Sequence, residues 1–240
     1  MMNNWQRHWP NYRKHSETIK VRTMLNFFRK RTPKFYFLQK SFGQKKFSLL
    51  DVGAGNHSAS KTKRLFPNCE YHGIDLSRHS NNDESDFAVM EVFYEMDLTL
   101  LKFDIIPDDY FDLIRMTHII EHLYNGDEVI KNLLPKLRKG GHIYIEYPGE
   151  KSTKLPSMKG TLNFYDDPSH VRIYSVKELS RLLKNNNATI LSAGTRRSAV
   201  FLIAMPFRII GSLLKGKKPQ ANMFWDLLGF AEFVYAKKIE

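Results

Sequence analysis

The sequence predicts an α/β fold in which a parallel sheet is covered by helices on both faces. Short apolar runs that suit strands alternate with helical patterns from residue 47 onward, and this order builds parallel sheets. The 240 residues are 42% hydrophobic and 26% charged, a globular composition with enough chain for one complete domain. Strands are expected at 47–51, 71–75, 92–97, 111–116, 142–147, 188–194 and 231–238, and helices at 12–41, 58–66, 127–138, 176–184 and 198–215.

Two features of this pattern indicate where a strand is preceded by a turn and at which edge of the sheet a ligand would bind. Gly140 and Gly141 are expected to interrupt the chain before the fifth strand. Open α/β sheets bind ligands at the carboxyl ends of their strands, near the point where the strand order reverses. Functional residues are therefore expected in the loops that follow the first four strands.

The basic charge of the chain is concentrated at its N-terminus. Residues 1–46 carry twelve Lys and Arg residues against the single acid Glu17, whereas 47–240 carry 25 against 24. Aromatic residues lie between the cations at 27–37, which suits the phosphates of a nucleic acid or a membrane surface, although a solvated helix explains the pattern equally well. We divide the chain into a basic, aromatic, largely helical arm at 1–46 and a main domain at 47–240.

Several classes of protein are disfavoured. The single cysteine, Cys69, rules out an internal disulfide and a cysteine-based zinc site. The first twenty residues lack the apolar segment of a secretory signal. The longest apolar stretch, 199–214, is short and is interrupted by Pro206, Arg208 and Gly211, so a membrane span is not expected. These features favour a reducing, cytoplasmic location.

A glycine turn follows the first predicted strand. Gly53 and Gly55 flank Ala54 after Asp51, and glycines there let the backbone approach a ligand closely. A dinucleotide fingerprint would place a third glycine at Ser58. An acid before the glycines also disfavours a pyrophosphate and favours a ligand with an amino group and a sulfonium. Taken alone, the turn could be an ordinary connection between a strand and a helix.

Carboxylates stand at the ends of the next two strands. Asp75 lies twenty residues after Gly55 and can accept hydrogen bonds from both hydroxyls of a ribose, although it could instead cap a helix. Asp97 could accept from an adenine amino group, with Met96 or Leu98 against the ring. Three later aspartates compete with Asp97 for this role, namely Asp104, Asp108 and Asp109.

Six ordered segments give the sequence a resemblance to the class I methyltransferases that use S-adenosylmethionine (SAM). The segments, which fall within residues 47–186, are LLDVGAGN, YHGIDLS, MDL, YFDLIRMTHIIEHL, LRKGGHIYIEYP and HVRIYSVKELSRLL. The later segments look most like the branch that methylates small molecules, quinone precursors and glycans. The resemblance implies SAM as cofactor and a Rossmann-like sheet of seven mostly parallel strands, with the last strand antiparallel beside the fifth. It implies cofactor contacts for Asp51, Gly53, Ala54, Gly55, Asp75, Leu76, Asp97, Leu98 and Thr117, and it places 115–118 along the cofactor edge.

Three histidines are candidates for the chemistry. Methyl transfer from a sulfonium is a direct displacement that depends on holding acceptor and methyl group in line, and a general base helps when the acceptor is a hydroxyl. Histidine has an ordinary pKa suited to a base, so His118, His122 and His170 are proposed as catalytic. His118 and His122 would share a face if they lay on a helix. Glu121 and His122 could equally serve only to hold the turn by hydrogen bonds.

The same residues allow two metal-based alternatives. His118, Glu121, His122 and His170 could ligate a metal, and the small-RNA 2′-O-methyltransferases of this fold look similar, with a Glu-x-x-Glu-His pattern and a later His. His118 stands here in place of their first carboxylate, which makes the site softer and less suited to magnesium. The segment 118–122 also spells the inverted zinc-protease motif His-x-x-Glu-His, which requires a long helix.

Two segments are expected on the acceptor side. The loop 148–172 is longer than a simple connection needs, and its Lys151, Lys154 and Lys159 could meet an anion while Phe164 and Tyr165 stack on a ring. The insert 198–230 begins with an apolar, basic-ended helix, which suits a membrane interface, a wall of the acceptor pocket or an ordinary core helix.

These observations predict a methyltransferase for a small-molecule, glycan or lipid-linked acceptor, methylated at oxygen. We expect a cytoplasmic enzyme with peripheral contact to the anionic inner face of the membrane. One alternative is an RNA 2′-O-methyltransferase with a His/Glu metal site, and another is a non-catalytic SAM-binding module.

Overall fold

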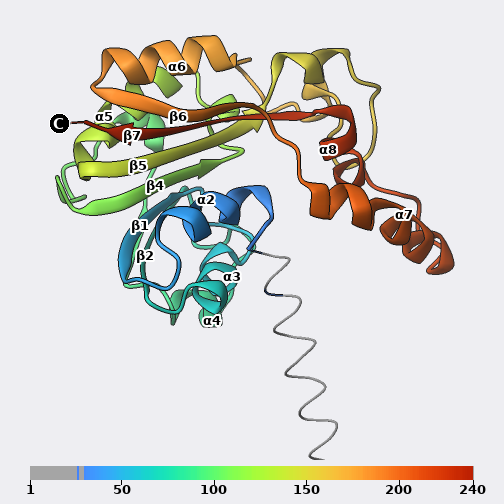
Figure 1. The fold of residues 1–240 in the computed structure, drawn as a ribbon, viewed down its shortest axis with the longest axis horizontal. Coiled ribbons are helices and arrows are strands. Elements are labelled where there is room, and N and C mark those ends of the chain that lie inside the picture. The colour runs from blue at the N-terminus through green and yellow to red at the C-terminus, as the bar shows by residue number, and fades with distance from the viewer. Residues whose placement is uncertain (1–25, 27–29, 240) are drawn as a thin grey trace, which may run out of the picture.

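The computed structural model describes residue 26 and residues 30–239, and these form a single seven-stranded sheet with helices on both faces (Figure 1). The sheet order is β3-β2-β1-β4-β5-β7-β6. The strands β1 to β5 pair in parallel, and β7 runs antiparallel between β5 and β6. The predicted fold class is confirmed. The strands are β1 (Phe47–Val52), β2 (Cys69–Asp75), β3 (Val92–Glu95), β4 (Phe111–Thr117), β5 (Leu137–Pro148), β6 (Ala188–Thr195) and β7 (Ala231–Lys238).

The helices lie in two layers and one projecting arm (Figure 1). The α-helices are α2 (Pro33–Ser41), α3 (Ser58–Leu65), α4 (Glu84–Phe87), α5 (Gly126–Leu133), α6 (Val176–Asn185), α7 (Ala199–Leu214) and α8 (Trp225–Leu228). Short 3-10 turns are η1 (Leu98–Leu100), η2 (Ile120–His122), η3 (Leu134–Lys136), η4 (Glu150–Lys154), η5 (Phe164–Asp166) and η6 (Ala221–Met223). The predicted helix at 12–41 is confirmed over α2 but is wrong at residues 30–32, which form a turn with extended backbone at Thr32, because Pro33 favours the first position of a new helix. Residues 12–25 and 27–29 lie outside the described residues.

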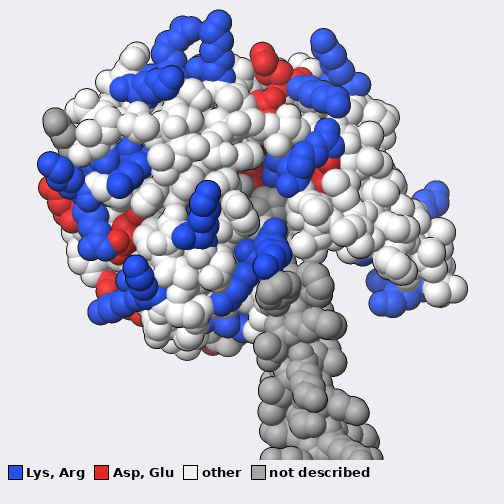
Figure 2. All heavy atoms as spheres, viewed as in Figure 1, with Lys and Arg blue, Asp and Glu red and all other residues white. Residues whose placement is uncertain are grey.

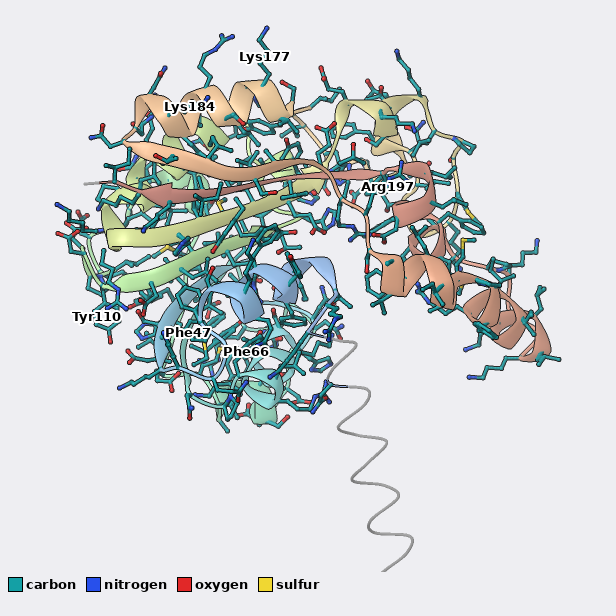
Figure 3. All side chains as sticks on the ribbon, in the orientation of Figure 1. Phe47, Phe66, Tyr110, Lys177, Lys184 and Arg197 are labelled. Atoms are coloured by element: carbon teal, nitrogen blue, oxygen red, sulfur yellow. The ribbon has the colours of Figure 1, made fainter. Side chains whose placement is uncertain are left out.

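Each face of the sheet has its own core, because successive strand residues point to opposite sides. Leu50 and Ile114 belong to the core beneath α5 and α6, whereas their neighbours Leu49 and Leu113 belong to the core beneath α2 and α3. The second core includes Phe47 and Phe66, whose rings meet edge to face (Figure 3). A sheet buried on both faces explains why its central strands read as continuous apolar runs.

Helix α2 contributes to this second core although it belongs to the predicted basic arm. Phe35, Phe37 and Leu38 are buried there, and the ring of Phe37 stacks on Tyr235 with centroids 4.4 Å apart. The arm therefore joins the sheet domain from α2 onward. The division at residues 46 and 47 stays a proposal for the residues that precede the helix.

The predicted break at the two glycines is wrong, because β5 runs through them. Gly140 takes the left-handed conformation, with φ of +77°, and the pairing of β4 with β5 shifts register nearby. The preceding helix also ends earlier than expected, at Leu133, because Pro135 cannot donate a backbone hydrogen bond and restricts the residue before it.

The loop 148–172 is folded back on itself by the turns η4 and η5. The carboxylate of Asp166 accepts backbone hydrogen bonds from Met158, Leu162 and Asn163. Burial opposes the charge, but a hydrogen bond from the Ser157 hydroxyl and these backbone hydrogen bonds together hold the pKa of Asp166 down at about 2. Phe164 is buried by the same fold, so the prediction that it stacks on an acceptor is wrong. Tyr165 is 68% exposed and is still able to make such a contact.

No helix among residues 26 and 30–239 is long and apolar enough to cross a membrane.

Candidate functional site

The glycine turn lies where β1, β2 and β4 end. The backbone N–H groups of Gly53 and Ala54 both donate to the carbonyl of Ile74, which holds the turn against β2. Gly53 has a φ of +83°, a conformation that glycine adopts without strain. A Cβ on Gly55 would lie 2.6 Å from the carbonyl oxygen of Ser80, so only glycine fits there. The turn therefore presents backbone without large side chains at this edge of the sheet.

Asp75 stands beside this turn at the end of β2. Its Oδ1 accepts hydrogen bonds from the backbone N–H of Leu76 at 2.8 Å and from the hydroxyl of Ser80 at 2.5 Å. Its Oδ2 points towards Gly55, 3.3 Å from where a Cβ would stand, and accepts no hydrogen bond from any described residue. A half-buried carboxylate with one oxygen available suits paired hydroxyl donors.

Asp97 lies on the neighbouring strand end. The backbone N–H of Met96 donates to the carbonyl of Asp75 at 2.9 Å, so the two strand ends are adjacent. Asp97 is exposed, and its Oδ1 accepts from the backbone and hydroxyl of Thr99, which lowers its pKa. Leu76 is 69% exposed and Leu98 is half-buried against the core. The structure thus gathers these predicted residues on one edge.

Asp51, a predicted cofactor contact, is buried and paired within the domain. It is 2% exposed, and its two oxygens accept hydrogen bonds from Arg115 at 2.8 and 2.6 Å, with Ser58 and Tyr71 as further donors. Burial opposes its charge, but Arg115 and these hydrogen bonds together lower its pKa. Arg115 is 1% exposed and faces Asp51 instead of lining the predicted cofactor edge. The pair lies under the glycine turn and supports it from inside the domain.

His118 follows β4 in a strained conformation between two carboxylates. Its φ is +56°, which non-glycine residues rarely adopt. Nδ1 lies 3.3 Å from Oε1 of Glu121, and Nε2 lies 3.2 Å from Oε1 of Glu146. Burial disfavours the imidazolium, yet the two glutamates outweigh it and raise the pKa of His118 to about 9. His118 is therefore charged at neutral pH, contrary to the ordinary pKa on which its predicted role as a base relied.

The charge network continues across β5 into the insert. Glu146 accepts from Arg196 at 3.0 Å, and Arg196 also donates to Asp226 at 2.6 Å. Although Glu146 is buried, Arg196 and His118 hold its pKa down at about 2. The ring of Trp225 lies 5.1 Å from that of His118, between centroids. The sequence did not reveal these partners because they are far apart in the chain. The glutamate within the apolar run IYIEYP does indicate a charge in a buried strand.

These side chains line a cavity of about 280 Å³ at the ends of β4 and β5. Figure 2 shows cationic and acidic side chains next to each other at the hollow between the sheet and the projecting arm. The cavity is lined by Thr32, Lys34, Thr117, His118, Glu146, Arg196, Phe201, Arg208, Asn222 and Trp225. It joins the predicted Thr117 and His118 to residues of α2, α7 and α8.

Lys34 is a second residue that sequence reasoning missed. It belongs to the predicted basic arm, and α2 brings it into the cavity wall. Burial and the neighbouring Arg115 disfavour its charge and lower its pKa to about 8. The basic composition of 1–46 concealed this position, because composition cannot distinguish one lysine from another.

His122 and His170 meet each other but not His118. The segment after β4 forms only the single turn η2, so the prediction that His118 and His122 share a helix face is wrong. The rings of His122 and His170 have centroids 4.8 Å apart. Each places Nδ1 near a backbone carbonyl, of Ser169 at 3.2 Å and of Phe164 at 2.7 Å.

The pair lies beside Glu121, whose carboxylate is 1% exposed. Ligand atoms of Glu121, His122 and His170 lie within 4.8 Å of one another, so three of the four predicted metal ligands come together. Histidines that donate Nδ1–H to carbonyls leave Nε2 available to a metal, so this donor set fits a divalent cation. The zinc-protease interpretation is wrong, because the motif stands on a three-residue turn and not on a long helix.

The family model of the methyltransferase domain matches residues 13–193 of the chain. A comparison with curated proteins gave no match. One similar solved structure is a chain of the Haloferax volcanii complex between a methyltransferase activator and a methyltransferase. It has 12% sequence identity and a TM-score of 0.60, and the match covers 86% of this chain and 89% of that chain. A SAM-dependent methyltransferase from Archaeoglobus fulgidus has 20% identity and a TM-score of 0.52, with coverage of 90% and 94%.

A third similar structure is larger than this chain. It is the Haemonchus contortus phosphoethanolamine N-methyltransferase 2 with phosphomonomethylethanolamine and S-adenosylhomocysteine, at 19% identity and a TM-score of 0.58. The match covers 86% of this chain and 52% of that chain, so this chain spans about half its length. At these identities the likeness establishes the fold alone, and the match to the methyltransferase domain establishes the family.

Proposed function

This chain belongs to the methyltransferase-domain family of SAM-dependent class I enzymes, and on that premise we propose that it methylates a hydroxyl of a small-molecule, glycan or lipid-linked acceptor. The observation that carries the proposal is the cavity at the ends of β4 and β5, which begins at Thr117 on the strand next to β1 and is lined by aromatic side chains and by the buried charges of Glu146 and Arg196. We further propose a cytoplasmic enzyme that works at the inner face of the membrane.

We place the cofactor along the edge formed by the ends of β1 to β4. The free Oδ2 of Asp75 would accept from the ribose hydroxyls, and the exposed Asp97 from the adenine amino group, with Leu76 and Leu98 on either side. The bare backbone of Gly53, Ala54 and Gly55 would lie against the amino-acid part. Asp51 would contribute through Arg115 and the shape of the turn, since both its oxygens are already engaged. Thr117 would border the reacting methyl group, because it lines the cavity at the end of β4.

When bound, SAM supplies an activated methyl group on a sulfonium. The acceptor oxygen forms its bond to the methyl carbon as the carbon–sulfur bond breaks, and the hydroxyl proton leaves. We propose that the cavity supplies mainly position and exclusion of water. Trp225 presents an aromatic surface, held by a hydrogen bond from its indole N–H to the carbonyl of Thr161 at 2.8 Å, and such surfaces suit sugar or aromatic rings.

His118 is the proposed contact for the reacting hydroxyl. Its conformation is strained and its ring is held from both sides by Glu121 and Glu146, so its position is overdetermined. In the charged form both ring N–H groups face glutamates, so the acceptor hydroxyl would have to displace one glutamate to receive a hydrogen bond from His118. In the neutral form it accepts the departing proton. His170, in the loop 148–172, and His122, at the end of η2, would border the same region.

A labelled-methyl assay tests the proposal. Purified protein is incubated with methyl-labelled SAM and separate pools of glycans, lipid-linked glycans, quinone precursors and RNA. We expect label in an alkali-stable ether on one of the first three pools. Replacing His118 with glutamine should lower kcat by about tenfold or more with an unchanged Kd for SAM, because general acid–base groups typically contribute such factors.

The control for this assay is His142→Gln in the middle of β5, away from the cavity lining, which should keep its activity. Label at nitrogen or carbon, or equal loss in both variants, would contradict the proposed role of His118.

A second candidate function follows from the trio of Glu121, His122 and His170. If these residues hold a divalent cation, the enzyme would orient acceptor hydroxyls by metal ligation, as an RNA 2′-O-methyltransferase with a His/Glu site would. The same assay distinguishes the two functions. Label on RNA that disappears with a chelator and returns with added metal supports the second, whereas chelator-resistant label on a glycan or small molecule supports the first.

Lys34 provides a separate prediction about the cofactor. Its ammonium lines the cavity beside Thr117, and we propose that it pairs with the carboxylate of the SAM amino-acid part. Lys34→Met should therefore weaken SAM binding by roughly tenfold, the effect of losing one charge-assisted hydrogen bond. Lys40→Met, on the exposed side of the same helix, is the matched control and should bind like the wild type. Equal affinities in a calorimetric titration of all three proteins would remove Lys34 from the site.

A further inference from the structure

We infer that the exposed face of α7 is a docking surface for anionic lipid bilayers, which places the acceptor cavity beside the lipid headgroups. Helix α7 projects away from the sheet, and its main contacts are with the short elements η6 and α8 (Figure 1). None of its sixteen residues is buried. A helix of a globular domain ordinarily turns its apolar side to the core, and this one does not.

The side of α7 that faces solvent is apolar from end to end. Its large exposed side chains recur at intervals of three or four residues as far as Leu213, with Leu214 next to it, which places them along one side of the helix. They are Ile203 at 70%, Phe207 at 73%, Ile210 at 55%, Leu213 at 57% and Leu214 at 83% exposure. The side chains that turn towards the domain, such as Phe201 and Met205, are only half-buried. Contiguous exposed apolar surface of this kind marks an interaction site.

The charges around the exposed face of α7 favour a negatively charged partner. Between Ser198 and Trp225 the chain has no Asp or Glu, whereas Arg208, Lys215, Lys217 and Lys218 are all in that range. The three lysines are exposed directly after the helix ends, and Figure 2 shows cations at the far end of the arm. Apolar side chains combined with lysines and without acids match the boundary between headgroups and acyl chains.

The geometry fits a helix that lies in the plane of the bilayer. Sixteen residues extend about 24 Å at 1.5 Å per residue, and Pro206 stands within the helix. One face is apolar and fully available, while the other rests against η6 and α8. A surface of this form can enter the interface without detaching from the domain.

The docking face and the cavity share the same helix. Phe201 and Arg208 of α7 line the cavity together with Trp225, while Phe207 and Ile210 point outward. An acceptor with a lipid tail could leave its tail in the bilayer and present its polar head to His118. This last step depends on the proposed methyl-transfer function, whereas membrane binding itself does not.

Flotation with vesicles tests the inference on the full chain. We expect the protein to float with vesicles of phosphatidylcholine and phosphatidylglycerol, and to bind pure phosphatidylcholine at least tenfold less. Added salt should weaken the binding, because exposed charges are screened. The double variant Phe207→Ser, Leu214→Ser should reduce the bound fraction at least tenfold, since each buried CH₂ contributes to interfacial binding.

A matched set of charge variants controls for net charge. Lys215→Gln with Lys217→Gln should reduce binding to the anionic vesicles about tenfold or more, because each lysine near an anionic surface contributes. Lys177→Gln with Lys184→Gln on α6, which point away from the domain (Figure 3), should not. A titration with SAM accompanies each variant and should be unchanged, which separates loss of membrane binding from loss of fold or of the cofactor site.

Three outcomes would overturn the inference. The wild type could fail to float with anionic vesicles, or the α7 variants could float as the wild type does. The wild type could also form a dimer in solution that Phe207→Ser, Leu214→Ser converts to a monomer, which would assign the face to a second copy of the chain. None of these outcomes bears on methyl transfer, since the assay contains no acceptor.

Discussion

Replacing Arg115 with methionine is expected to destabilise the fold by about 3–5 kcal/mol, because it leaves the Asp51 carboxylate charged, buried and without its main partner. The guanidinium donates to both oxygens of Asp51 and also reaches the hydroxyls of Ser58 and Thr62 at 3.1 Å. Loss of the guanidinium therefore removes four hydrogen bonds to three side chains beneath the glycine turn. Chemical unfolding followed by circular dichroism gives the change in free energy of unfolding.

The double variant Asp51→Leu, Arg115→Met is the control for this effect. Removing both charges leaves no uncompensated ion, so it should recover most of the stability lost in the single variant. If the single variant loses less than about 1 kcal/mol, the range of an exposed ion pair, the pair is not buried as described. If the double variant is as unstable as the single one, packing and not charge explains the loss.

Asp75→Ala is expected to weaken SAM binding by roughly a hundredfold or more. A carboxylate that accepts from two ribose hydroxyls makes two charge-assisted hydrogen bonds, which together contribute about 3 kcal/mol or more. The fold should be affected little, since Asp75 accepts only from the local Leu76 and Ser80. Calorimetric titration measures the affinity, and the unfolding curve confirms the fold.

Asp97→Ala is the matched comparison at the next strand end. Because Asp97 is exposed and its Oδ1 is engaged by Thr99, its loss should weaken SAM binding less than the loss of Asp75. A larger effect at Asp97 than at Asp75 would reverse the assignment of ribose and adenine contacts. No effect at either position would place the cofactor elsewhere on the sheet edge.

The sequence was sufficient to predict the strands, their parallel order and the glycine turn. These depend on local pattern: the apolar run 47–51, the turn at Gly53 and Gly55, and the acid at Asp75 each signal their role within a few residues. The antiparallel last strand came from the family resemblance instead, since pairing direction is not visible in a strand's own residues. The resemblance also supplied SAM, which composition alone does not specify.

The electrostatics of the site could not be predicted, because they arise from contacts across the chain. Asp51 and Arg115 are 64 positions apart in the chain, and Glu146 and Arg196 are 50 positions apart. The residues around each acid do not indicate which arginine it pairs with. The ordinary pKa of histidine was also a poor guide, since Glu121 and Glu146 raise the pKa of His118 to about 9 and so favour its charged form. The left-handed turn at His118 also separates it from His122, which spacing alone had placed on one face.

The measurement that tests the central claim most directly is a calorimetric titration of the wild-type chain with SAM. The account predicts one binding site per chain with micromolar affinity, competed by S-adenosylhomocysteine and weakened by Asp75→Ala. A folded protein that binds neither compound would contradict the assignment of the strand ends to this cofactor. The cavity at His118 would then have to be explained without methyl transfer.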